Sequence, residues 1–202
     1  LARMDQDLAT VHGHIDVIIK AAQRAGIIVR NLQSFGRLEK NVEIASLSKP
    51  LEEALSLVKQ ELVKGSVEVE KDYREDPAVS IDPGQMSQVF LNLMINAIHA
   101  MPSGGKLKLG LGSQTRERRP GVCCTVGDTG FGISAEVLPR IFEYAYTTKG
   151  ENGTGLGLSI SKEIIESHGG ALTVTTDSGE GSSKGPGKGT EFQVWLPIVP
   201  KG

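Results

Sequence analysis

The stretch Gly153-Thr154-Gly155-Leu156-Gly157-Leu158-Ser159-Ile160 decides how the rest of the chain is interpreted. Its glycines stand at alternate positions and lead directly into apolar residues at helical spacing. This pattern predicts a glycine-rich loop that feeds the N-terminus of a helix. Such a terminus favours an anion through its free backbone N–H groups and dipole, and glycine lets the anion approach closely. We therefore expect a phosphate-binding loop, and a plain tight turn is the alternative.

Two other phosphate-binding motifs do not fit this sequence. No Gly-x4-Gly-Lys-Ser/Thr occurs, and Gly187-Lys188-Gly189-Thr190 only resembles its end. A dinucleotide fingerprint needs Gly-x-Gly-x-x-Gly directly after a strand, whereas residues 149–152 are polar. The loop therefore needs support from motifs elsewhere in the chain.

Composition limits the classes of function. The 202 residues suit one domain with an appendage, or two small domains. The net charge of −2 gives no electrostatic reason to expect nucleic-acid binding. Cys123 and Cys124 are adjacent on a predicted strand, 122–126, so no disulfide between them is expected. Without a signal peptide or an apolar run of about 18 residues, we expect a cytoplasmic fragment, with any membrane attachment supplied by a sensor segment outside this sequence.

A heptad pattern covers residues 1–38. A helix of that length would extend roughly 57 Å, too far to bury its seam on a small domain. The pattern therefore predicts a bundle or coiled coil, most simply a homodimer, although Gly13 and Gly26 each cost a helix ~1 kcal/mol. The alternative is a single helix lying along its own domain. The seam consists of Leu1, Met4, Leu8, Val11, Ile15, Ile18, Ala22, Ala25, Val29 and Leu32.

A change of pattern near residue 45 predicts a domain boundary, with residues 1–44 in the first domain and residues 45–202 in the second. The second domain is expected to begin with a helix over about residues 50–64, opened by Pro50 and ended by Gly65. Alternating apolar residues then predict further strands, at 67–73, 79–81 and 190–196.

Residues 85–101 predict a helix that carries two asparagines. Asn92, Asn96 and His99 stand at i, i+4 and i+7, on one face. Asparagine is unfavourable inside a helix, so two of them one turn apart suggest amide oxygens facing a cavity. Mg²⁺ takes few protein oxygens and keeps waters and phosphate oxygens, so one amide could be its ligand. A solvated face is the alternative.

Two polar elements stand near the glycine loop. Asp128 follows the strand at 122–126 inside a glycine turn, where it could cap the turn or accept a hydrogen bond from an amine such as N6 of adenine. Lys149 lies in a polar segment directly before the loop and is a candidate contact of a lid over phosphates. Residues 177–189, rich in Gly, Ser and Lys, predict a mobile loop.

Together these motifs resemble the N, G1, F, G2 and G3 boxes of sensor histidine kinases, in that order. The superfamily also includes gyrase, heat-shock chaperone and mismatch-repair ATPases. The resemblance covers about residues 45–198, and the short lid is most similar to the nitrogen-regulator branch. The matching segments are Gln88–Met101, Asp128–Ile133, Ile141–Lys149, Gly153–Leu158 and Gly187–Thr190.

The resemblance implies an α+β fold, a two-layer α/β sandwich whose mixed sheet is covered by helices on one face, preceded by a long dimerisation helix. It implies ATP and Mg²⁺ in a cleft, with Asn96 as the Mg²⁺ ligand and Asn92 beside the phosphates. Asp128 would bind adenine, and His99 stands where many relatives carry Lys or Arg toward the phosphates. Further cofactor-binding roles fall on Gly130, Gly132, Lys149, Gly153, Gly155, Leu156, Gly157, Leu158 and Thr190.

By the same resemblance the chain is expected to be a protein histidine kinase that acts on a response regulator receiver domain through two-component signalling. Related hydrolases carry a glutamate at the position of Asn92, and an amide cannot take a proton from water, which favours phosphoryl transfer over hydrolysis. His12 and His14 do not match the acceptor box of the family, so the acceptor histidine is expected outside this sequence. An ATP-dependent conformational switch and a non-catalytic nucleotide-sensing module are the alternatives.

Overall fold

The computed structural model describes residues 41–148, 154–177 and 189–199. The chain divides into two compact units, of which the second comprises Lys40–Tyr146 and Gly155–Gly202. Every helix and strand of the described residues belongs to this second unit. The predicted dimerisation helix over residues 1–38 lies outside the described residues.

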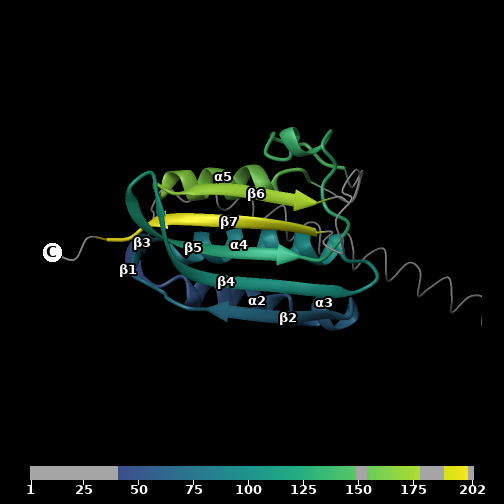
Figure 1. The fold of residues 1–202 in the computed structure, drawn as a ribbon, viewed down its shortest axis with the longest axis horizontal. Helices are drawn as coiled ribbons and strands as arrows, with labels where there is room; N and C mark the ends of the chain where they lie inside the picture. Colours follow the sequence, from purple (N-terminus) through teal and green to yellow (C-terminus); the bar gives the residue numbers. More distant parts are fainter. Residues whose placement is uncertain (1–40, 149–153, 178–188, 200–202) are drawn as a thin grey trace, which may run out of the picture. The chain divides into compact units, whose positions relative to one another are not determined.

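A five-stranded mixed sheet forms the body of this unit, in the order β2-β4-β5-β7-β6 (Figure 1). Strand β2 runs parallel to β4, and every other neighbouring pair is antiparallel. A separate pair joins β1 to β3. The bounds are β1 Glu43–Ala45, β2 Val67–Tyr73, β3 Val79–Ile81, β4 Gly105–Arg116, β5 Arg119–Asp128, β6 Ala171–Asp177 and β7 Gly189–Pro197.

Helices lie against one face of this sheet and bury the core (Figure 1). The long helix α4 packs against α2 and α5 and against β5. This two-layer arrangement confirms the predicted α+β sandwich. None of the described helices is both long and apolar enough to cross a membrane. The helical bounds are α2 Ser48–Leu57, α3 Lys59–Lys64, α4 Pro83–Ala100, α5 Gly157–Ser167 and the short 3-10 helix η1 Leu138–Arg140.

Alternation along the strands decides which side chains reach the core. In β5, Val122, Cys124 and Val126 are buried beneath the helices, while Cys123 faces the other side of the sheet and is half-buried. Both cysteines are free, as their adjacent positions predicted.

The helix predicted over about residues 50–64 differs from the structure at both its start and its middle. It begins at Ser48 because the Asp76 carboxylate accepts the backbone N–H groups of Leu47 at 2.9 Å and Ser48 at 3.1 Å. It breaks at Val58 into α2 and α3. Gly65 ends α3, as predicted.

Strands β4 and β6 are not among the elements predicted from sequence. In β4 the buried Leu107, Leu109 and Leu111 alternate with the more exposed Lys106 and Lys108. That period of two is the ordinary pattern of a half-buried strand and was sufficient to find it.

Candidate functional site

Helix α4 carries the two predicted asparagines and is fixed firmly at its start. Asp82 caps it, because its carboxylate accepts the backbone N–H of Gln85 at 3.1 Å, and Pro83 occupies the first turn. The apolar face of α4 is fully buried, whereas Asn92 and Asn96 are half-buried and His99 is exposed. The predicted polar face therefore lies at the border of the core.

Asn92 connects α4 to the start of α5. Its amide nitrogen Nδ2 donates to the Gly157 carbonyl oxygen at 3.3 Å and to Ser161 Oγ at 3.4 Å. Gly157 is the first residue of α5, and a β-carbon there would lie 3.7 Å from Cγ of Asn92. The structure thus brings together the asparagine helix and the glycine loop, which are 65 residues apart in sequence.

The glycine loop turns sharply into α5. Gly155 has a φ of +66°, a conformation that glycine adopts without strain. Helix α5 follows at once, and its N-cap residue, Leu156, makes no side-chain capping hydrogen bond. Leu156 and Leu158 pack on the hydrophobic core and anchor the loop. The start of α5 is therefore a helix terminus suited to an anion.

Asp128 stands at the end of β5 and holds two other segments. Its Oδ1 atom accepts the backbone N–H groups of Gly130 at 2.8 Å and Thr190 at 3.3 Å. Its Oδ2 atom accepts no hydrogen bond from the described residues. Burial raises the pKa of the Asp128 carboxyl above its ordinary value, and the two backbone hydrogen bonds oppose that rise.

The turn after Asp128 packs against the end of α4. A β-carbon on Gly130 would lie 2.8 Å from Cβ of Ala100, and the backbone N–H of Phe131 donates to the Ala100 carbonyl at 3.2 Å. Gly132 has a φ of +74°, which again suits glycine. Both predicted glycines are thus required by the backbone here.

Thr176, which was not predicted as a site residue, connects the end of this turn to the start of β7. Its hydroxyl accepts the backbone N–H of Ile133 at 2.8 Å, donates to the Gly189 carbonyl at 3.0 Å and lies 3.2 Å from the buried Thr190 hydroxyl. No motif in the sequence marks this residue. The only signal is its position at the end of β6, a strand whose partner in the sheet is β7.

The described candidate residues therefore gather through direct contacts. Asn92 contacts Gly157, Gly130 packs against the end of α4, and Asp128 binds the start of β7. Two predicted site residues, Lys149 and Gly153, lie outside the described residues. So do residues 178–188 of the predicted mobile loop, which include Gly187 and Lys188. In the lid segment, Tyr144 is exposed and the Tyr146 ring stacks on the Arg140 guanidinium, 4.2 Å from the ring centroid.

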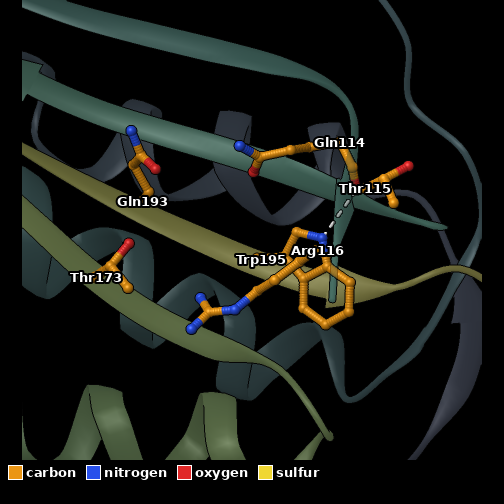
Figure 2. Close-up of a pocket in the computed structure, with 6 residues that line it drawn as sticks. All are labelled: Gln114, Thr115, Arg116, Thr173, Gln193 and Trp195. Atoms are coloured by element: carbon orange, nitrogen blue, oxygen red, sulfur yellow. Dashed lines mark hydrogen bonds between the residues drawn. The ribbon is translucent and has the colours of Figure 1, made fainter. Parts of the chain in front are cut away.

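A separate hollow of about 320 Å³ lies elsewhere on the sheet (Figure 2). It is built by side chains from β4, β6 and β7, with the Trp195 indole N–H donating to the Gln114 carbonyl at 2.9 Å. None of the predicted nucleotide-binding residues lines it. The lining residues are Gln114, Thr115, Arg116, Thr173, Gln193 and Trp195.

Comparison with known proteins places this geometry in a family. Residues 81–200 match the family model described as histidine kinase-, DNA gyrase B-, and HSP90-like ATPase. The chain belongs to this ATPase family. Within the family, its relatives and structural neighbours include sensor histidine kinases, and the described unit has the fold of their ATP-binding catalytic domain.

Three of these proteins show how similar the sequences and structures are. The chain is 32% identical over 190 residues to the sensor histidine kinase ZraS of Salmonella typhimurium, and 35% identical over 185 residues to the sensor protein FixL of Bradyrhizobium diazoefficiens. These matches cover 93% and 89% of this chain but only 38% and 35% of the relatives. The catalytic domain of histidine kinase ThkA superposes with a TM-score of 0.64 at 29% identity, covering 78% of this chain and 95% of that domain.

Proposed function

We propose that this chain is the ATP-binding catalytic region of a two-component sensor histidine kinase, which transfers the γ-phosphoryl group of ATP to a histidine outside this sequence. One feature of the site supports this most directly. Asp128 and Asn92 each use one polar atom on neighbouring protein groups, while Oδ2 of Asp128 and Oδ1 of Asn92 accept no hydrogen bond from the described residues. Within the described part of the chain, both oxygens are therefore available to a ligand.

Each residue then has a defined task. Oδ2 of Asp128 accepts the exocyclic amine of adenine, while Oδ1 stays on Gly130 and Thr190. The first turn of α5 binds phosphate oxygens through its backbone N–H groups. His99 is exposed on the same face as the asparagines and would lie toward the phosphates, at the position of the Lys or Arg of many relatives.

The donor set also fits Mg²⁺. Among the described residues, no group of three His, Cys, Asp or Glu side chains could hold a metal ion on its own. A cation that keeps waters and phosphate oxygens needs few protein ligands, and Asn96 would supply an amide oxygen. When bound, Mg²⁺ would neutralise charge on the phosphate oxygens.

The amide of Asn92 favours transfer over hydrolysis. A residue that activates water for hydrolysis must take a proton, and an amide cannot. An acceptor imidazole is itself a nucleophile, so the site has to hold the nucleotide in line and stabilise charge rather than deprotonate water.

Calorimetry with ATP and MgCl₂ tests the binding site. We expect binding by the unaltered chain and at least a tenfold loss in Asp128→Asn, because the adenine amine loses a carboxylate acceptor. Asp72→Asn is the matched control, since Asp72 is exposed and paired with Arg74 at 2.7 Å. Equal affinity in Asp128→Asn and the unaltered chain would refute the pocket.

Radiolabelled ATP, with and without a separate histidine-bearing helix hairpin from a sensor histidine kinase, tests the reaction. We expect an acid-labile label on the hairpin only. Steady phosphate release without any acceptor would identify an ATP-dependent switch instead, and nucleotide binding without transfer would identify a sensing module.

We further propose that this region is cytoplasmic, forms a homodimer through its N-terminal helix and binds a response regulator receiver domain. Dimerisation is assigned to the heptad pattern of residues 1–38, and the receiver domain follows from the proposed histidine kinase activity. Sedimentation of the chain with and without residues 1–38 tests the dimer, which should be lost in the shorter form.

A further inference from the structure

The orientation of the Asn92 amide is fixed by its two neighbours on α5. Nδ2 lies 3.3 Å from the Gly157 carbonyl oxygen and 3.4 Å from Ser161 Oγ. A backbone carbonyl can only accept a hydrogen bond, so the nitrogen of the amide, and not its oxygen, must face Gly157. The oxygen Oδ1 is on the other side of the carbamoyl carbon and points away from the Gly157 carbonyl and Ser161 Oγ.

Ser161 completes this constraint. It is fully buried in the middle of α5, and its hydroxyl donates to the Gly157 carbonyl at 2.8 Å. Because that proton is already committed, Ser161 Oγ can meet Asn92 only as an acceptor. Both partners of the amide are therefore acceptors, and a flipped amide would set its oxygen against two oxygens.

We infer that Ser161 is a positioning residue that turns Oδ1 of Asn92 toward the bound phosphates and thereby makes the site prefer metal-bound ATP to metal-free ATP. This inference rests on the proposed function. It concerns Ser161, which touches neither nucleotide nor metal and acts through Asn92.

The preference follows from the sign of the charges. An amide oxygen beside a triphosphate meets phosphate oxygens of the same sign, so it is favourable only when a cation or a cation-bound water lies between them. An amide nitrogen in that place would donate to the phosphates directly, whether or not metal is present. Losing the constraint should therefore weaken binding of metal-bound ATP while leaving binding of metal-free ATP unchanged or stronger.

The test is calorimetry of ATP in MgCl₂ and of ATP in EDTA. The affinity for ATP in MgCl₂ divided by the affinity for ATP in EDTA is expected to fall about fivefold in Ser161→Ala. A factor of about five corresponds to the net free energy of one buried hydrogen bond. Ser167→Ala is the matched control on the same helix, because Ser167 Oγ bonds the Ile164 carbonyl at 2.9 Å at the end of α5 opposite to Gly157. It should keep the unaltered ratio.

A double-mutant cycle separates positioning from a general loss of packing. If Ser161 acts through Asn92, Ser161→Ala should leave the metal ratio unchanged in an Asn92→Ala background. Ser161→Cys, which keeps nearly the same volume with a weaker acceptor, provides the same test should Ser161→Ala fail to fold.

Each outcome bears on one of the two proposals. An unchanged ratio in Ser161→Ala or Ser161→Cys, or an equal effect with and without Asn92, would overturn the inference alone. If the unaltered chain bound neither form of ATP, the proposed function would fall and the inference with it.

Discussion

Gly155 lies so close to the backbone of Ala145 that a β-carbon on Gly155 would come within 2.6 Å of the Ala145 carbonyl oxygen. The glycine loop at Gly155 and the segment around Ala145 are therefore packed directly together. Gly155 also has a φ of +66°, so Gly155→Ala adds both a clash and backbone strain. We expect this variant to lose about 2 kcal/mol of stability or more, measured by urea unfolding, and to bind ATP at least tenfold more weakly by calorimetry.

Gly157→Ala is the matched control for stability, because the nearest atom to its β-carbon would be Cγ of Asn92 at an ordinary 3.7 Å. It should be no less stable than the unaltered chain. Equal loss of stability in the two variants would show that the close approach to Ala145 is not what requires glycine at position 155.

Ala145 itself has a φ of +59°, which costs an alanine about 1 kcal/mol. Ala145→Gly removes that strain, although glycine also gives the unfolded chain more freedom. We expect a change between zero and about 1 kcal/mol in favour of the folded state, measured by urea unfolding. A clear loss of stability would mean that the methyl group of Ala145 makes a packing contribution larger than the strain.

Asp128→Asn should separate stability from binding. Burial raises the pKa of Asp128 above its usual range, so the folded chain holds this proton to a higher pH than the unfolded chain does. The unfolded state then binds fewer protons over that interval, and stability falls as pH rises through it. At neutral pH the neutral amide removes this penalty, so the variant should be no less stable than the unaltered chain while losing ATP affinity.

The pH dependence of unfolding in urea checks this. The stability difference between Asp128→Asn and the unaltered chain should change as pH passes through the interval between the ordinary aspartate pKa and the raised one, and level off below it. Asp72→Asn serves as the control, because the Arg74 guanidinium lowers the pKa of Asp72 and reverses the expected sign. A pH-independent difference in Asp128→Asn would contradict the argument.

His168 joins the end of α5 to the start of α4. Its Nε2 atom accepts the backbone N–H of Asp82 at 3.0 Å, while Nδ1 donates to the Ile164 carbonyl at 2.7 Å. Asp82 is only 3% exposed, so His168→Ala leaves a buried N–H without its acceptor and should cost about 1–3 kcal/mol in urea unfolding. Ser167→Ala, which removes a bond to the same Ile164 carbonyl at 2.9 Å, should cost less than about 1 kcal/mol. Equal costs would contradict this role for His168.

Much of the fold could be predicted because the glycine loop, the asparagine helix and the strand before Asp128 each carry a local pattern. The alternation of Leu107, Leu109 and Leu111 was just as readable, and only Gly110 and Gly112 weaken it. The break at Val58 was not readable, because α2 and α3 continue one helical pattern. The start at Ser48 was not readable either, because the carboxylate that binds Leu47 and Ser48, Asp76, comes from a distant loop.

The candidate site divides in the same way. Asp128, Asn92 and the glycines stand in motifs with recognisable spacing, so they could be named before any contact was known. Ser161 and Thr176 could not, because their importance depends on partners that only folding brings near. A serine on the apolar face of an amphipathic helix is the one weak sequence signal that such a partner exists.

Trp195 offers a test of the other face of the sheet. It is the only tryptophan of the chain and is 6% exposed, although it lies outside the helix-covered core. Gly121 makes this burial possible, because a β-carbon there would overlap the indole and lie 2.6 Å from the Leu196 carbonyl oxygen. Gly121→Ala should therefore displace the ring, break its bond to Gln114 and cost about 1–3 kcal/mol.

Fluorescence reads this change directly, since all tryptophan emission comes from Trp195. Emission should shift to the red in Gly121→Ala as the indole meets water. Gly112→Ala is the control in the neighbouring strand, where the nearest atom to a β-carbon would be Cβ of Arg74 at 4.0 Å. The emission of Gly112→Ala should match that of the unaltered chain. A red shift of equal size in Gly112→Ala would mean that Trp195 responds to any substitution in the sheet, and not to the loss of the space that Gly121 leaves for the indole ring.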